Sequence, residues 1–195
     1  MTPELPEFLV EETGQVPRAA VVPDRAPPPG ESGLWVFIFG DMTLFAAFFV
    51  VFLWEFRQDR SGFSASADQL LLPLGAVNTL VLLTSSLLVV LGVHRGRRGA
   101  FTGALLCGSL FVVLKVTEYV HEAGLGNTLA TDSFFTFYYV FTGIHLLHVL
   151  VGGVLLVSAR HGTSRRFIEG AGTYWHLVDL LWVVLFSLFY LAGAA

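Results

Sequence analysis

Residues 134–159 read FFTFYYVFTGIHLLHVLVGGVLLVSA, and this stretch contains no Asp, Glu, Lys or Arg. As an α-helix rising 1.5 Å per residue it is about 39 Å long, which exceeds the roughly 30 Å of a bilayer's hydrocarbon core. Four other runs reach spanning length, at about residues 34–54, 70–93, 101–121 and 176–193. The sequence therefore predicts an all-α membrane protein, a bundle of five transmembrane helices.

The composition excludes a soluble globular enzyme. Of the 195 residues, 54% are hydrophobic and only 13% are charged, whereas about a quarter of the residues of an ordinary soluble domain are charged. The single cysteine, Cys107, excludes a disulfide framework and any Cys-based zinc or iron–sulfur site within this chain. The part of the chain after residue 33 has as many acids as bases, so we expect no nucleic-acid binding.

The amino-terminal segment differs from the rest of the chain. Seven of the eight prolines precede residue 30, and residues 1–33 contain six acids and two arginines. A segment of this composition cannot bury enough apolar surface to fold. We predict a disordered, Pro- and acid-rich cytoplasmic tail over residues 1–33, followed by a transmembrane domain over residues 34–195.

The arginines predict the orientation. With five spans, eight of them fall on the side of the amino terminus: Arg18, Arg25, Arg95, Arg97, Arg98, Arg160, Arg165 and Arg166. Only Arg57 and Arg60 fall on the opposite side. Because cytoplasmic loops carry the excess of Lys and Arg, the amino terminus is predicted to be cytoplasmic.

Several ionisable residues lie inside the predicted spans, where each needs a partner, water or a lipid headgroup. Lys115 and Glu118 are three residues apart and share one helix face, as a neutralised polar pair would. Asp41 has no base within one turn of its own helix, so it must be protonated, paired across helices or hydrated. The chemistry of Asp41 leaves open whether it has a functional or lipid-facing role or a purely structural one.

Three pairs of metal-ligand type occur at i, i+3 spacing: Glu118 and His121, His145 and His148, and His176 and Asp179. This spacing resembles that of a carboxylate-bridged metal bundle. However, the third span ends on the outer side while the fifth begins on the inner side, so one metal could not gather both His121 and His176. We therefore expect no metal in this chain, and we interpret these histidines as interhelical hydrogen-bond donors.

Four ordered stretches together resemble subunit III of the haem–copper oxidases. They are WVFIFGD at 35–41 with Phe45, Phe48 and Phe49 after it, PLGAVNTLVLLTSS at 73–86, KVTEY at 115–119 leading to TGIHLLHV at 142–149, and YWHLVDLLW at 174–182. The resemblance covers about residues 34–193. The chain looks like the five-helix form of the family, which lacks the first two helices, so the resemblance does not establish the lipid cleft that those helices border. Asp41 stands where the family usually has Glu, and Lys115 where the aa-type subunits usually have Gln.

The resemblance implies a non-catalytic subunit of a respiratory terminal oxidase of the cytochrome c oxidase type, in a bacterial-type plasma membrane. Such a subunit packs on oxidase subunit I, together with subunit II, and supports proton uptake and the stability of the oxygen-reducing, proton-pumping complex. It implies that the haems and copper lie in the partner subunits, that this chain holds no cofactor, and that phospholipid is bound. Asp41, Glu118, His145 and His148 would be associated with protons or lipid, and the pairs Lys115–Glu118 and His176–Asp179 would be structural.

Alternatives remain open at this point. The short chain, Asp41 and Lys115 also resemble quinol-oxidase subunits III and the accessory proteins of nitric oxide reductases. A rival of another class is an autonomous membrane protein that binds haem or metal, or that is linked to proton transport. Its motivation is the number of charged residues and histidines within helices.

Overall fold

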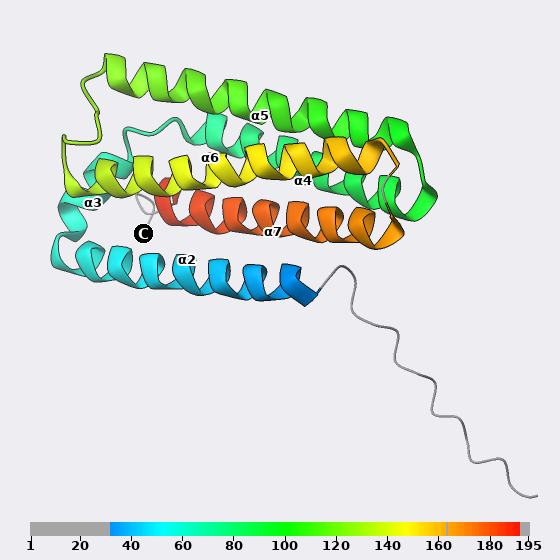
Figure 1. Cartoon of the computed structure of the whole chain (residues 1–195). Helices are drawn as coiled ribbons and strands as arrows, with labels where there is room; N and C mark the ends of the chain where they lie inside the picture. Colours follow the sequence, from blue (N-terminus) through cyan, green and yellow to red (C-terminus); the bar gives the residue numbers. More distant parts are fainter. Residues whose placement is uncertain (1–31, 163, 192–195) are drawn as a thin grey trace, which may run out of the picture.

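The computed structural model describes residues 32–162 and 164–191, and within them the chain forms helices and no strands (Figure 1). The helices are α2 (Ser32–Gln58), α3 (Arg60–Ala67), α4 (Leu72–Arg95), α5 (Arg98–Gly124), α6 (Ser133–Arg160) and α7 (Arg165–Tyr190). All except the short α3 are long and apolar enough to cross a membrane. The prediction of an all-α protein with five spans is confirmed.

Four of the five spans begin and end within four residues of their predicted bounds, but the fifth does not. It was predicted over 176–193, whereas α7 begins at Arg165 and ends at Tyr190. The first turns of α7, before the predicted start, contain Arg165, Arg166 and Glu169. Because these residues are polar, a search for apolar runs does not detect this part of the helix. The Ser164 side chain caps this start by accepting a hydrogen bond from the Phe167 backbone N–H at 3.3 Å.

The helix α2 begins at Ser32, two residues before the predicted start of the first span at residue 34. Residues 1–31 lie outside the described part of the chain, so their predicted disorder stays a prediction. The helix α3 was not predicted: it has only eight residues and begins after Asp59, whose carboxylate accepts a hydrogen bond from the Gly62 backbone N–H.

Four of the helices, α4 to α7, form a ring in which each contacts the next and α7 returns to α4 (Figure 1). The helix α2 lies outside this ring and packs against α6 and α7 mainly through aromatic side chains. Phe48 stacks on Phe141 of α6 with ring centroids 5.4 Å apart, and Phe52 meets the edge of Phe189 of α7 at 5.2 Å.

The side chain of Trp175 in α7 packs against the other three helices of the ring. Its indole lies where Gly108 of α5 and Gly152 of α6 leave room, because a Cβ on either glycine would lie within 2.9 Å of the ring. Its Nε1 donates a hydrogen bond to Ser85 of α4 at 3.1 Å. One side chain thus connects all four helices of the ring.

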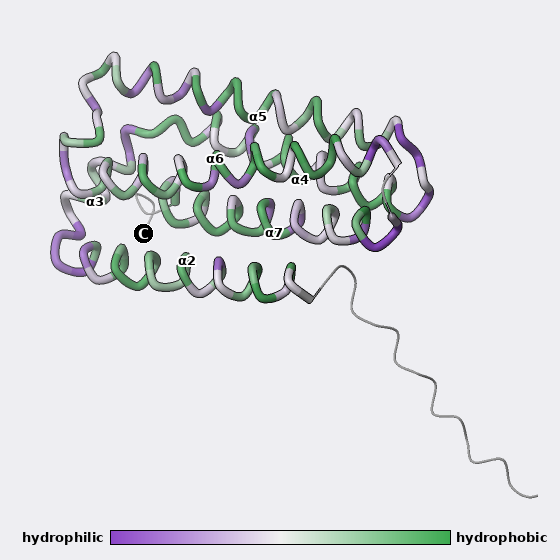
Figure 2. The backbone as a smooth tube through the Cα atoms, in the orientation of Figure 1, coloured by the Kyte–Doolittle hydropathy of each residue, from purple (hydrophilic) through white to green (hydrophobic). Residues whose placement is uncertain are grey.

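The two ends of the bundle differ in charge. The turns between α4 and α5 and between α6 and α7 lie at the same end as the start of α2 (Figure 1), and this end is strongly hydrophilic (Figure 2). We call it the arginine-rich end; its arginines are Arg95, Arg97, Arg98, Arg160, Arg165 and Arg166. The opposite end carries α3 and, among the described residues, only two arginines, Arg57 and Arg60.

Candidate functional site

Three groups of buried or partly buried polar side chains lie between the membrane-spanning helices. We name them the Asp41 cluster (Asp41, His148 and Tyr174), the Lys115 cluster (Lys115, Glu118, Tyr138 and Tyr190) and the α4–α7 seam (Thr79, Ser85, Ser86, Trp175, His176, Asp179 and Trp182). All of them lie within helices long enough to span a membrane, where polar side chains are costly and are typically functional.

The Asp41 cluster joins α2 to the ring. A carboxylate oxygen of Asp41 lies 3.0 Å from His148 Nε2, and Asp41 is 9% exposed. The other ring nitrogen, His148 Nδ1, is 2.8 Å from the Ile144 backbone carbonyl oxygen. Of the three states open to Asp41 in the sequence analysis, the structure shows a contact across helices.

This geometry fixes how protons are distributed over the pair. A carbonyl oxygen only accepts, so His148 Nδ1 must carry a hydrogen and donate a hydrogen bond to the Ile144 carbonyl oxygen. A neutral His148 then has an unprotonated Nε2, which can bond only to a protonated Asp41 carboxyl group; a charged His148 bonds to the carboxylate. In either state the Asp41–His148 contact contains one proton, which the two side chains share.

Apolar and aromatic groups enclose this shared proton. Phe45 meets the His148 ring edge-on with centroids 5.7 Å apart, and Tyr174 stacks on the same ring at 6.5 Å. The second carboxylate oxygen of Asp41 and the Tyr174 hydroxyl group are buried and have no hydrogen-bond partner among the described residues. The cluster therefore has unused hydrogen-bonding capacity beside the shared proton.

The Lys115 cluster, in contrast, is fully bonded. Lys115 Nζ donates to Glu118 Oε2 at 3.1 Å, to the Tyr138 hydroxyl oxygen at 2.8 Å and to the Tyr190 hydroxyl oxygen at 2.9 Å. The Tyr190 hydroxyl group donates to the other Glu118 oxygen. All three ammonium N–H groups are used, and the buried positive and negative charges balance. This closed network fastens α5, α6 and α7 together.

Neither tyrosine of the Lys115 cluster was predicted as a site residue from the sequence. Tyr190 could have been found from the sequence. It is the last of four large residues on one face of α7, after Trp175, Trp182 and Phe186, and such a stripe predicts a face packed against the bundle. Tyr138 is 23 residues from Lys115 on another helix, and no local pattern links them.

In the α4–α7 seam, side chains of α7 bond to hydroxyl groups of α4. His176 Nδ1 lies 2.5 Å from Ser86 Oγ, and Trp182 Nε1 donates to Thr79 Oγ1 at 3.1 Å. His176 and Asp179, predicted as structural polar residues on one face, do not bond to each other: His176 makes its hydrogen bond across helices, to Ser86 of α4. Asp179 also lies beside Ser86, but neither of its carboxylate oxygens forms a hydrogen bond of good geometry within the described chain.

The two histidines of α6 have different neighbours. His148 contacts α2, whereas His145 lies fully buried between Phe111 of α5, at 5.7 Å, and Trp182 of α7, at 5.3 Å. Neither ring nitrogen of His145 has a hydrogen-bond partner in the described residues. The interpretation of His145 as an interhelical hydrogen-bond donor is therefore wrong.

No three His, Cys, Asp or Glu side chains come together as metal ligands within residues 32–162 and 164–191. The three i, i+3 pairs stay apart: Glu118 belongs to the Lys115 cluster, His148 to the Asp41 cluster and His176 to the seam. His176 also lies about 16 Å from the start of α7 rather than at the membrane face, because that helix begins at Arg165.

A sequence model described as "Cytochrome c oxidase subunit III" matches residues 30–194. The chain belongs to this family. As a subunit III of a haem–copper oxidase, it is a multi-pass membrane protein and one part of a multi-subunit oxidase complex. The match covers all five spans and the three buried polar clusters.

Its relatives include subunits III of oxidases with different names. The chain is 32% identical over 192 residues to "Cytochrome c oxidase subunit 3" of Alkalihalophilus pseudofirmus, covering 88% of this chain and 92% of the relative. It is 31% identical over 179 residues to "Quinol oxidase subunit 3" of Bacillus spizizenii, covering 83% and 86%. A further relative, "Cytochrome c oxidase subunit 3" of Thermostichus vulcanus, is 31% identical over 175 residues, covering 82% and 85%. The family is thus shared by cytochrome c and quinol oxidases.

Proposed function

We propose that this subunit III is the non-catalytic membrane subunit that packs on subunit I of a cytochrome c oxidase, beside subunit II, and that it supports proton uptake and the lifetime of the complex. The haems and copper are held by the partner subunits, and the complex lies in a bacterial-type plasma membrane. The single observation that carries the role in proton uptake is the Asp41–His148 pair, because its two side chains share one proton inside an apolar enclosure.

The position of the Asp41 cluster supports this role. Asp41 and Tyr174 each lie nine residues from the start of their helices, which is about 14 Å from the arginine-rich end. By the distribution of arginines this end is the cytoplasmic one, from which an oxidase of this kind takes up protons. The shared proton would thus lie in the cytoplasmic half of a roughly 30 Å hydrocarbon core, which is the proposed uptake side.

The surface of α2 supports packing within a larger membrane complex. Large apolar side chains remain exposed on it, including Val36 at 74%, Val50 at 67% and Trp54 at 66%. In a bilayer such side chains contact lipid tails or the apolar surface of another membrane subunit, and neither contact is costly. The chain can therefore bind a partner subunit with α2 while the ring of α4 to α7 keeps its structure.

The test replaces Asp41 by asparagine, which preserves shape but cannot share the proton. Glu55→Gln is the matched control, since Glu55 is the other carboxylate of α2 and lies near the opposite end. Each variant complex is reconstituted into vesicles, and the initial rate of oxygen reduction, the protons pumped per electron and the number of turnovers before inactivation are measured.

We expect Asp41→Asn to keep the initial rate within about twofold but to pump fewer protons per electron or to inactivate several-fold sooner, while Glu55→Gln matches the wild type. His148→Asn should behave like Asp41→Asn, because it removes the other half of the pair. Wild-type values of all three quantities in both Asp41→Asn and His148→Asn would contradict the proposed role.

The electron donor is tested separately, since the named relatives include both kinds of oxidase. The purified complex is given reduced cytochrome c or a quinol, and oxygen consumption is recorded. We expect oxidation of cytochrome c. Activity with quinol alone would assign the chain to a quinol oxidase, and reduction of nitric oxide without oxygen consumption would assign it to a nitric oxide reductase.

A further inference from the structure

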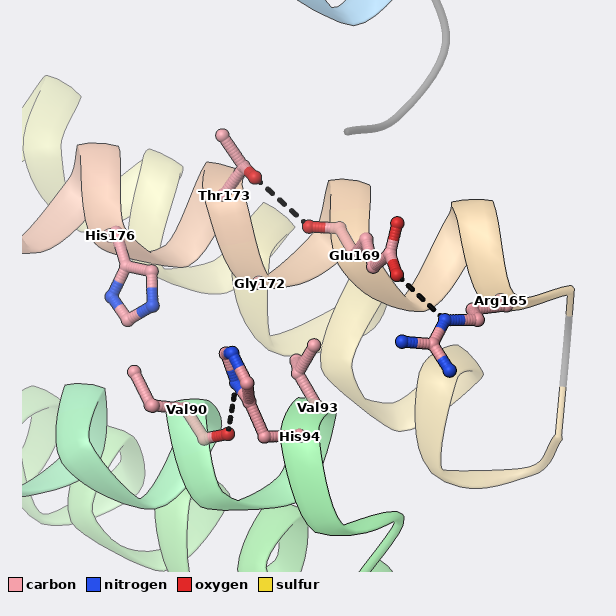
Figure 3. Close-up of a pocket in the computed structure, with 8 residues that line it drawn as sticks. All are labelled: Val90, Val93, His94, Arg165, Glu169, Gly172, Thr173 and His176. Carbon is pink, nitrogen blue, oxygen red and sulfur yellow. Dashed lines mark hydrogen bonds and ion pairs between the residues drawn. The ribbon is translucent and has the colours of Figure 1, made fainter. Parts of the chain in front are cut away.

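Two adjoining pockets open at the arginine-rich end of the bundle. The first, of about 430 Å³, lies between the end of α4 and the start of α7 (Figure 3). The second, of about 300 Å³, continues from it toward the turns that join α4 to α5 and α6 to α7. Both are lined by Val93, His94, Arg165 and Glu169. Together they form one continuous depression, which we call the arginine groove.

The arginine groove is positively charged. Three arginines line it, each from a different helix: Arg98, Arg160 and Arg165. Glu169 is the one acidic side chain among its described lining residues. Arg165 Nε bonds to Glu169 at 2.8 Å (Figure 3), but the Arg165 side chain is 87% exposed, so water weakens this ion pair. Three guanidinium groups against one carboxylate leave an excess of two positive charges.

Apolar side chains line the arginine groove between these charges. Val90 and Val93 belong to α4, and Ile168 belongs to α7. Val90 is 36% exposed, so part of this apolar wall is open. A ligand that fills the arginine groove therefore needs acidic groups and apolar groups close together.

The chain itself contains a segment of this composition. Residues 4–12, which precede the described part of the chain, read ELPEFLVEE. Four of these nine residues are glutamates, none is basic, and the apolar residues Leu5, Phe8, Leu9 and Val10 alternate with them. The segment thus offers acidic groups to the arginines and apolar groups to the wall of the groove.

The point of attachment lies within reach of the arginine groove. The helix α2 begins at Ser32, at the same end of the bundle as the groove (Figure 1). Since α2 contacts α7 and α7 contacts α4, and packed helices lie about 8–10 Å apart, the separation is roughly 20 Å. A linker as long as residues 13–31 spans about 60 Å in the polyproline form and roughly 25 Å on average as a flexible chain. Both distances exceed the separation.

We propose that residues 4–12 dock in the arginine groove of the same chain, with their glutamates beside Arg98, Arg160 and Arg165 and their apolar side chains against the groove wall. Guanidinium groups pair with carboxylates in a planar geometry of two hydrogen bonds. A single exposed ion pair is weak, so the segment is held by several pairs together with apolar contacts. Because the segment is tethered, its effective concentration at the groove is on the order of millimolar.

Photo-crosslinking in the assembled oxidase complex tests this docking. Phe8→benzoylphenylalanine places a light-activated group within residues 4–12 at the site of an aromatic side chain. The complex is reconstituted in phosphatidylcholine vesicles, irradiated, and digested with a protease that does not cut at arginine. We expect the main product found by mass spectrometry to join residue 8 to peptides from residues 90–98 or 160–172.

Two triple variants form a matched pair for the groove. Arg98→Gln with Arg160→Gln and Arg165→Gln removes the three arginines that line it. Arg95→Gln with Arg97→Gln and Arg166→Gln removes three exposed arginines of the same end that do not line it. Both change the net charge by the same amount. We expect the yield of the crosslink to fall at least fivefold in the groove variant and less than twofold in the control variant.

Two double variants of the amino-terminal segment give an independent test in case the groove variant fails to assemble, because they leave the spanning helices unchanged. Glu11→Gln with Glu12→Gln removes two charges from residues 4–12, and Asp24→Asn with Glu31→Gln removes two charges outside them. We expect the first to lower the crosslink yield at least threefold and the second to leave it within twofold of the wild type.

Other occupants of the arginine groove give other results. Crosslinks chiefly to lipid, to a partner subunit or to a second copy of this chain would overturn the proposal. Equal losses within either matched pair would overturn it, as would a yield that stays constant when NaCl is raised from about 50 to 500 mM. Loss of the crosslink when phosphatidylglycerol replaces about a quarter of the phosphatidylcholine would show that lipid headgroups fill the groove, and would also overturn it.

Discussion

Asp41 and His148 lie 107 residues apart in the chain, and their side chains meet at 3.0 Å between α2 and α6. The rest of the contact between α2 and the ring is largely aromatic. Since aromatic packing is adaptable whereas a buried polar pair has one partner geometry, we infer that this pair sets the depth at which α2 docks against the ring.

The balance of charge in the Lys115 cluster predicts a non-additive pair of substitutions. Lys115→Met alone leaves Glu118 as an uncompensated buried charge and should cost about 3 kcal/mol or more in the stability of the complex. Lys115→Met combined with Glu118→Gln should be markedly less harmful than Lys115→Met alone. Thermal unfolding in detergent measures both, and a double variant as damaging as the sum of the two single variants would argue against the ion pair.

Tyr190 bonds to both charged groups of the Lys115 cluster, which predicts an unequal effect of two hydroxyl deletions. Tyr190→Phe removes a partner from Lys115 and one from Glu118, so it should cost about 2 kcal/mol. Tyr139→Phe, in which only a bond to the Asn127 carbonyl oxygen is lost, should cost about 1 kcal/mol or less. Equal shifts of the unfolding midpoint in the two variants would show that Tyr190 does not stabilise the Lys115 cluster through bonds to both Lys115 and Glu118.

Neighbouring glycines of α6 predict opposite results for the same substitution. A Cβ on Gly152 would lie 2.8 Å from the Trp175 ring, whereas one on Gly153 would meet nothing within 4 Å. Gly152→Ala should therefore lower stability by about 1–3 kcal/mol through overpacking, and Gly153→Ala should leave it unchanged or raise it slightly. If Gly152→Ala were as stable as the wild type in thermal unfolding, Trp175 would not occupy the centre of the ring.

The two hydrogen bonds of Ser85 predict that its hydroxyl group contributes to the free energy of unfolding. Its hydroxyl group accepts from Trp175 Nε1 and donates to the Ala104 carbonyl oxygen at 2.9 Å, so Ser85→Ala leaves a buried indole N–H without a partner. We expect a loss of about 1–2 kcal/mol. Ser187→Ala is the control, because Ser187 is exposed and donates only to its own helix. Equal stability of the two variants in thermal unfolding would show that Ser85 does not stabilise the α4–α7 seam.

The spans and one polar contact were predictable because their signals are local. Hydropathy along the chain located four helices, and the i, i+3 spacing of Lys115 and Glu118 placed two side chains 3.1 Å apart. The start of α7 lacks such a local signal, because its first turns are rich in polar residues and glycine. These turns are stabilised by packing against α4, which hydropathy does not report.

Partners on distant helices could not be predicted. The spacing of His176 and Asp179 places them on one face of α7, but it could not show that His176 would bond to Ser86 of α4. Likewise, the spacing of His145 and His148 could not show that one ring would lie among Phe111 and Trp182 while the other met Asp41. Which neighbour a buried polar side chain meets is decided by helix packing, which single-sequence patterns do not contain.

The central claim is that this chain acts as a subunit and not as an autonomous haem or metal protein. The most direct measurement is an optical spectrum and subunit analysis of what co-purifies with the tagged full chain in mild detergent, compared with the chain isolated from its partners. We predict that haem appears only together with a large second polypeptide and that the isolated chain is colourless. Haem or metal that stays in stoichiometric amount with the isolated chain would contradict it.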